Sequence, residues 1–208
     1  MRSGLASGVG PWGSALPLFV KRVLPAPFAP GAAHSSLMVW IRAMTVIDDP
    51  LAEVLAFLAE RRILTLATIG PHGQPQAADV YYAETDELAL YFISLPGSRH
   101  AANLARDSRV AATLHADSSR WRDIRGVQVE GTCTPVAGAG RAAAYTRYTA
   151  KFPFVLADAA LARALQKVDI YGITPHWLRW VDNSLGLGHN QEWIVADGQW
   201  KVAVAPDA

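Results

Sequence analysis

The sequence is poor in cysteine: its 208 residues include only Cys133. A single cysteine excludes an internal disulfide and any metal site built from several thiolates. Cys133 lies in an alternating apolar run, which favours a buried structural thiol over a catalytic one. Such low cysteine usage is typical of a reducing compartment, so we expect a cytoplasmic protein.

Long apolar runs and a strong net charge are also missing. No stretch approaches the roughly 20 apolar residues that cross a bilayer, so we expect no membrane segment. The net charge is +1, which gives no reason to expect a nucleic-acid partner. A phosphate-binding P-loop, a nucleophile elbow and closely spaced histidines are absent as well. We therefore assign no metal ligand and no catalytic residue.

Acidic residues are absent from residues 1–43, which are rich in alanine, proline and glycine. The apolar stretch SALPLFV in this segment is short, contains Pro17 and precedes a Lys-Arg pair, which is the wrong order for a secretory signal. We interpret residues 1–43 as a flexible extension, or as sequence upstream of a true start at Met38 or Met44. Residues 44–208 are long enough for one domain with its own core.

The sequence of this domain is dominated by short alternating runs. Residues 49–62 have the apolar spacing of a helix, and three strand-like runs joined by short turns follow, which predicts a β-meander. Turns this short do not allow parallel crossovers, so we predict a mainly β fold, an antiparallel barrel with flanking helices. Strands are expected at 62–69, 76–83, 88–93, 109–116, 125–136, 168–174, 176–183 and in a hairpin over 192–204, and helices at 99–105, 140–152 and 157–167.

The stretch SLPGSRHAANL, residues 94–104, carries the clearest chemical signal. Ser98 is a suitable N-cap for a short helix whose first N–H groups have a partial positive charge. Arg99 and His100 add donors beside them, and the arrangement suits a phosphate. The stretch also fits an ordinary capped helix with solvated cations, and the local sequence taken alone favours that second interpretation.

The order of the elements adds a resemblance to a known family. The corner S-x-x-G-S-R-H is followed by W-x-x-I-x-G-x-Q-x-x-G at residues 121–131 and by D-N-x-x-G-x-G at residues 182–188. This order resembles the flavin-binding split barrels related to pyridoxamine 5′-phosphate oxidase, and is most similar to a small, poorly characterised branch. The resemblance runs from about residue 55 to 136 and extends through residues 177–193.

The resemblance implies an antiparallel FMN-binding split barrel that forms a homodimer, with FMN in a groove between the subunits. It implies that Val80 and Tyr81 contact the flavin ring and that Ile93 and Ser94 lie near the ribityl chain and phosphate. The phosphate itself would be held by Ser98, Arg99 and His100. Further candidates for cofactor contact are Trp121, Arg125 and Gln128.

The sequence departs from the oxidases proper at two positions. An arginine of those enzymes is replaced by Ala78, and a lysine by His100. Phosphate affinity should fall unless Arg122 or Arg125 compensates. The Arg-x-His signature that serves the pyridoxal substrate is absent from HWLRWVDN, so we do not expect oxidation of vitamin B6.

These observations lead to two functional hypotheses. The first is an FMN-binding oxidoreductase acting on a small molecule, with deazaflavin as a further cofactor option. The second is a non-catalytic flavin or haem carrier on the same fold, in which His100, His115 or His189 would be an axial ligand. The role of the helical segment 139–167 stays open.

Overall fold

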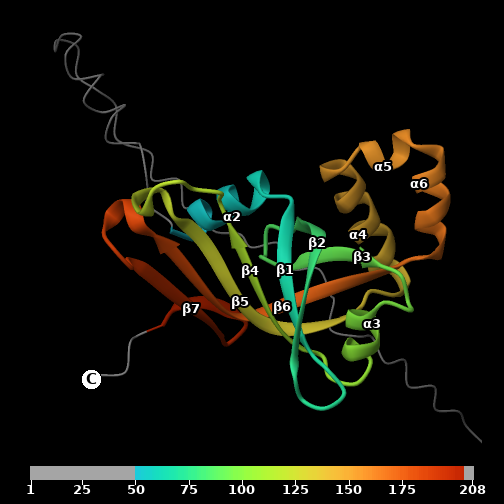
Figure 1. The fold of residues 1–208 in the computed structure, drawn as a ribbon, viewed down its shortest axis with the longest axis horizontal. Helices are drawn as coiled ribbons and strands as arrows, with labels where there is room; N and C mark the ends of the chain where they lie inside the picture. The colour runs from blue at the N-terminus through green and yellow to red at the C-terminus, as the bar shows by residue number, and fades with distance from the viewer. Residues whose placement is uncertain (1–49, 204–208) are drawn as a thin grey trace, which may run out of the picture. The chain divides into compact units, whose positions relative to one another are not determined.

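The computed structural model describes residues 50–203, so the expected extension at 1–43 and Asp49, where the first helix was expected to begin, lie outside the described residues. Within the described part, eight strands and a set of short helices follow the order in Figure 1. The strands are β1 (Ile63–Ile69), β2 (Pro75–Glu84), β3 (Leu90–Ser94), β4 (Arg109–His115), β5 (Arg125–Pro135), β6 (Asp169–Asp182), β7 (Asn190–Ala196) and β8 (Gln199–Val202).

The helices lie between or beside these strands. They are α2 (Pro50–Glu60), α3 (Arg99–Leu104), α4 (Gly138–Lys151), α5 (Phe154–Ala157) and α6 (Ala159–Ala164), with short 3-10 turns η1 (Trp121–Asp123), η2 (Leu165–Lys167) and η3 (Asn183–Leu185). In the part of the chain that the structure describes, no helix is long and apolar enough to cross a membrane.

The strands form one antiparallel sheet that closes on itself. Its order is β3-β2-β1-β4-β5-β6-β7-β8, and β3 also pairs with β6. The closing register sets Phe92 opposite Tyr171, and the two rings stack with centroids 5.3 Å apart. Strands β1 to β6 therefore make a closed barrel, and β7 and β8 extend it as a hairpin. The predicted antiparallel barrel with flanking helices is confirmed.

Alternation along the strands separates a core from an outer face. In β5, Val127, Val129 and Cys133 are buried, whereas Gln128 and Glu130 are exposed. Burial also raises the pKa of the Cys133 thiol to about 12, so the thiol is structural, as the sequence indicated.

The helical segment after β5 has a small core of its own. Tyr148, Phe152, Val155 and Leu165 are buried and pack with Ala83 of β2. Figure 1 shows α4, α5 and α6 grouped on the side of β2 and β3. This segment covers one wall of the barrel, whereas Ala111, Gln128 and Glu130 on the outer face of β4 and β5 are exposed.

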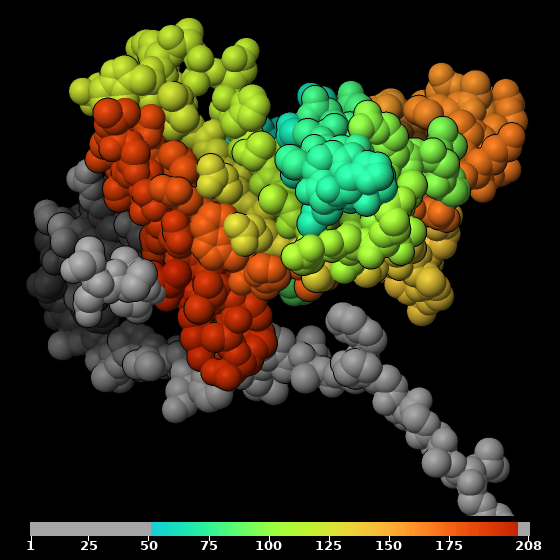
Figure 2. Space-filling view, turned by 60° about the horizontal axis from the view of Figure 1, so that its bottom comes forward, coloured from blue at the N-terminus to red at the C-terminus, as the bar shows by residue number. Residues whose placement is uncertain are grey.

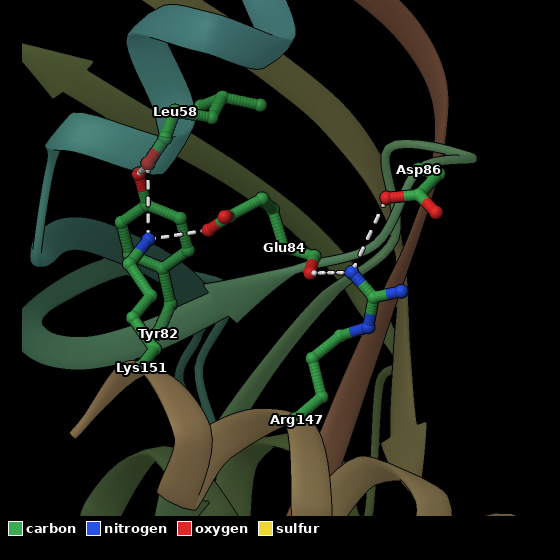
Figure 3. A network of polar contacts seen from close by, with 6 residues as sticks. All are labelled: Leu58, Tyr82, Glu84, Asp86, Arg147 and Lys151. Carbon is green, nitrogen blue, oxygen red and sulfur yellow. Dashed lines mark hydrogen bonds and ion pairs between the residues drawn. The ribbon is translucent and has the colours of Figure 1, made fainter. Parts of the chain in front are cut away.

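Helix α4 is attached to the barrel through charged side chains, as Figure 3 shows. Lys151 pairs with Glu84, lies 4.1 Å from the centroid of the Tyr82 ring and donates to the Leu58 carbonyl over 3.0 Å. The Tyr82 hydroxyl donates to that same carbonyl over 2.7 Å. Because Leu58 lies in the last turn of α2, a cation there also interacts favourably with the helix dipole. Lys151 thus connects α4, β2 and α2.

Two sequence predictions of element boundaries are wrong. The strands expected at 168–174 and 176–183 are one strand, β6, which continues through Pro175 because the register with β5 shifts between Glu130 and Gly131. A Cβ at Gly131 would lie 2.5 Å from the Thr174 carbonyl oxygen, so the close approach requires glycine. The helix expected at 157–167 is divided, because the Asp158 carboxylate accepts from the N–H groups of residues 160 and 161 and starts α6 anew.

Candidate functional site

The corner before α3 forms a connected polar group. Ser98 caps α3, its Oγ accepting from the Ala101 N–H over 3.2 Å, as predicted. The buried Ser94 hydroxyl lies 2.8 Å from Ser98 Oγ and 2.6 Å from His100 Nε2. The imidazole is therefore oriented by a hydroxyl that is itself held by the helix cap. Burial lowers the pKa of His100, which favours its neutral form.

A pocket of about 280 Å³ lies directly beside this corner. Arg99 and His100 of α3 line one side, and Ala77 and Ala78 of β2 line the other, where the inward-facing Ala78 has only a small side chain. The structure thus brings two of the predicted phosphate contacts, Arg99 and His100, to one cavity, with Ser94 and Ser98 behind His100. Its volume is close to the lower limit for small-molecule sites.

Three other predicted contacts lie on the neighbouring strands. Val80 is buried, so only its main chain can face a ligand. Tyr81 is 45% exposed on the outer face, and its ring meets that of Phe152 edge-on with centroids 5.2 Å apart. Ile93 packs against the small core beneath α4–α6. None of these three lines the 280 Å³ pocket.

Trp121, Arg125 and Gln128 lie away from this pocket. Gln128 is exposed on the outer face, paired in register with Thr113. Arg125 begins β5 at the end where β5 meets His115, the last residue of β4, whereas α3 leads into the opposite end of β4 at Arg109. Seven residues of strand separate the two ends, which is about 20 Å. In Figures 1 and 2 the segment around residues 116–122 stands apart from α3 and the β1–β2 turn.

The motifs at residues 121–131 and 182–188 meet in space and stabilise each other. The buried Asp182 carboxylate pairs with Arg125 over 2.8 Å and accepts from the Ser184 N–H. Asn183 donates to the Trp121 carbonyl over 3.0 Å and accepts from the Gly188 N–H. Gly188 has a φ of +74°, which favours glycine. Arg125 is therefore paired with Asp182, and the D-N-x-x-G-x-G motif forms the loop between β6 and β7.

Residues that the sequence analysis did not single out complete the pocket. Thr68 and Gln76 line it, and both accept from the side chain of the buried Asn103 over 2.9 Å. A polar residue on the inner side of a short helix was the available signal, since Asn103 lies beside the apolar Leu104. Its partners could not be named without the fold, because they are 35 and 27 residues away in sequence.

Comparison with known proteins places this geometry in a family. The family model described as pyridoxamine 5′-phosphate oxidase matches residues 51–182. A UPF0306 protein of Enterobacter sp. (strain 638) is 29% identical over 150 residues, covering 72% of this chain and 99% of that protein.

Two solved structures share the fold. A conserved hypothetical protein from Mycobacterium tuberculosis has a TM-score of 0.57 and 28% identity, with 71% of this chain and 93% of that one covered. A haem-binding protein from Mycobacterium smegmatis has a TM-score of 0.60 and 22% identity; the match covers 72% of this chain and 60% of that protein.

The match with the family model spans the barrel, the Ser94–His100 corner and the motif at residues 121–131, and it ends at Asp182, the first residue of the D-N-x-x-G-x-G motif. Ala78 and His100 stand where the oxidases proper have an arginine and a lysine. The chain belongs to the pyridoxamine 5′-phosphate oxidase-like split-barrel family and is not a true pyridoxamine phosphate oxidase.

Proposed function

We propose that this protein binds FMN and acts as a flavin-dependent oxidoreductase on a small molecule. The observation that carries the proposal is the convergence of Arg99 and His100 on the 280 Å³ pocket over β2, in a chain of this family. Arginine is a permanent cation with several donors, which suits a phosphate. The small side chain of Ala78, which pairs in register with the buried Leu66, leaves space that a phosphate and part of its chain need.

The residues present fit the cofactor as follows. Arg99 would hold the phosphate, His100 would donate to it from a position oriented by Ser94, and the main chain at Val80 and the ring of Tyr81 would border the flavin. Bound FMN would supply the hydride and electron transfer that no side chain here supplies. The role of the protein is then to bind, to orient and to limit the access of water.

We further propose that the active form is a homodimer. The pocket at α3 and the residues Trp121 and Gln128 are too far apart to meet one ligand within a protomer, whereas a second copy packed against the outer face could bring its own Trp121 toward the pocket. Along one row of that face, Ala77, Ala67 and Ala111 pair in register on β2, β1 and β4. Small side chains allow close packing of another chain.

Haem binding without catalysis is the second candidate function, and the observation that favours it is the haem-binding neighbour with the same fold. Of the candidate axial ligands, His115 is exposed, with Nδ1 3.4 Å from the Ala116 carbonyl oxygen. His189 is exposed as well, whereas His100 is half-buried against Ser94. We favour flavin because the chain belongs to the pyridoxamine 5′-phosphate oxidase-like family, which commonly binds flavin.

The test is to purify the protein, release any ligand by heat and identify it by mass spectrometry, which separates FMN, deazaflavin and haem. FMN is then titrated by fluorescence into wild type and Arg99→Ala. Because Arg99→Ala loses one charge-assisted contact, its affinity for FMN should be about tenfold lower or more. Arg163→Ala, which removes an exposed arginine on α6, should bind like wild type. Unchanged FMN affinity in Arg99→Ala would show that the phosphate assignment is wrong, and a Soret band in the purified protein would favour haem.

A further inference from the structure

The floor of the 280 Å³ pocket is formed by two residues that pair across β1 and β2. Thr68 and Gln76 are register partners, and both side chains reach the pocket. The Thr68 hydroxyl has its bonds within the protein: it accepts from Asn103 Nδ2 over 2.9 Å and donates to the Gln76 carbonyl oxygen over 3.4 Å. Gln76 differs, because only the Oε1 of its side chain is engaged.

Asn103 is the buried centre of this group. It is 2% exposed, and its Nδ2 donates both to Thr68 Oγ1 and to Gln76 Oε1 over 2.9 Å. Its Oδ1 accepts from Arg106 Nη2 over 2.6 Å. All the polar atoms of the Asn103 side chain are thus directed at named partners.

The direction of every bond in this chain follows from Arg106. A guanidinium only donates, so it must face the oxygen of the Asn103 amide. The amide nitrogen of Asn103 then faces Gln76, and Gln76 must turn its own oxygen toward it. The Nε2 of Gln76 is left with two hydrogens and has no acceptor among residues 50–203. The series of hydrogen bonds from Arg106 through Asn103 to Gln76 therefore ends on a donor, the Gln76 amide nitrogen, at the pocket.

We propose that Gln76 contacts the ligand in this pocket through its amide N–H, and that Asn103 is the positioning residue that keeps this donor turned outward. The partner is an anionic oxygen, because Arg99 and His100 line the same cavity. Two sources share that chemistry, the phosphate of FMN and a propionate of haem. The inference rests on the proposed function and assigns a specificity residue to it.

The experiment compares ligands that differ only in the anionic group. FMN and riboflavin are titrated by fluorescence, and haem and its dimethyl ester by absorbance, into wild type, Gln76→Glu and Asn103→Asp. The carboxylate introduced by Gln76→Glu would present an oxygen where the ligand needs a donor. With Asn103→Asp, the carboxylate accepts from Arg106 but cannot donate to Gln76, so Gln76 turns and presents its own oxygen. One of the two pairs, FMN with riboflavin or haem with its ester, is expected to bind. For that pair, both variants should weaken binding of the anionic ligand by about tenfold or more, and binding of its neutral analogue by less than about twofold.

Three controls distinguish orientation from general damage. Gln74→Glu adds the same charge in the exposed β1–β2 turn and should keep the anionic preference. In a Gln76→Ala background, Asn103→Asp should cause no further loss beyond about twofold, because its effect passes through Gln76. Thermal unfolding checks that each variant is folded.

The outcomes separate this inference from the proposed function. If wild type prefers FMN to riboflavin and both substitutions leave that preference unchanged, the role of Gln76 is wrong and the proposed function stands. Preference for haem over its ester, lost in both variants, supports the contact and identifies the propionate as its source. If wild type takes up neither cofactor, the proposed function fails and this inference fails with it.

Discussion

At the scale of single residues, His100 shows how burial can shift the pKa of a side chain. Its Nε2 meets the buried Ser94 hydroxyl over 2.6 Å, and its ring lies against Phe92 with centroids 6.0 Å apart. Burial lowers its pKa, so the neutral ring predominates near neutral pH. A neutral histidine can donate one hydrogen bond to an anion but contributes no charge, which leaves Arg99 as the permanent cation of the pocket.

The stability of the protein should depend on pH through His100. Because its pKa is lower in the folded chain, the unfolded chain binds this proton more readily, and the free energy of unfolding falls as pH drops below the ordinary histidine value of about 6.5. This contribution is fully present above that value. Urea unfolding measures the free energy of unfolding at about pH 7.5 and about pH 5. Between these two values it should fall further in wild type than in His100→Gln, whose side chain at this position cannot titrate.

The matched control for this prediction is His72→Gln in the exposed β1–β2 turn. That variant should keep the wild-type dependence on pH. Equal pH slopes for wild type and His100→Gln would show that protonation of His100 does not oppose folding.

At the scale of elements, the attachment of α4 depends on a partly buried ion pair. The side chains of Lys151 and Glu84 are only 13% and 17% exposed, and Lys151 also meets Tyr82 and the end of α2. Burial lowers the pKa of Lys151, and the hydrogen bond to Glu84 opposes that shift. Arg147, one turn earlier, donates to the Glu84 carbonyl over 3.0 Å, as Figure 3 shows. The C-terminal half of α4 is thus held at two successive turns.

Removing the charge of Lys151 should destabilise the fold. Lys151→Met keeps the apolar stem but leaves Glu84 without its partner, and should lower the free energy of unfolding by about 2–4 kcal/mol. Adding Glu84→Gln to this variant should recover part of that loss, because no unpaired carboxylate remains. Urea denaturation measures both.

Lys201→Met is the control for that experiment. Lys201 pairs with Asp197 in the exposed β7–β8 turn, and its loss should cost less than about 0.5 kcal/mol. If Lys151→Met behaves like Lys201→Met, the network of Figure 3 does not stabilise the attachment of α4.

The elements also show what sequence patterns can and cannot predict. Alternation and turn residues are local, so seven of the strands and the turn at Asp197 and Gly198, both with positive φ, follow from the sequence. The continuity of β6 through Pro175 does not, because it depends on the pairing with β5, in which Glu130 and Gly131 pair with Trp177 and Pro175 and His176 is skipped. The corner at Ser98 was likewise visible as a local cap. The group around Asn103 was not, since its contacts come from two other strands.

At the scale of the whole barrel, the connections decide which faces are covered. The segment from α4 to α6 follows β5 and covers β2 and β3, and α2 supplies Val54, Phe57 and Leu58 to the main core. The outer row through Ala67 and Ala111 continues to Glu130 on β5 and Trp177 on β6, and Ala111 and Glu130 are exposed. A hollow of about 430 Å³ lies along this row, lined by Ala67, Ala111, Glu130 and His176. These features favour this face as the surface for the proposed second copy.

A bulky charge on that face should separate assembly from folding. Ala111 is exposed in the middle of β4, so Ala111→Arg has room in a monomer but would oppose close packing of a second copy. We expect wild type to sediment as a dimer and Ala111→Arg as a monomer, with thermal unfolding nearly unchanged and FMN binding weaker by about tenfold or more, because each pocket would lose the residues supplied by its partner. Ala164→Arg on the exposed side of α6 should remain a dimer with wild-type FMN affinity. A monomeric wild type that binds FMN would contradict the proposed dimer, since a pocket complete within one protomer needs no second copy. A dimeric Ala111→Arg would contradict this face as the interface.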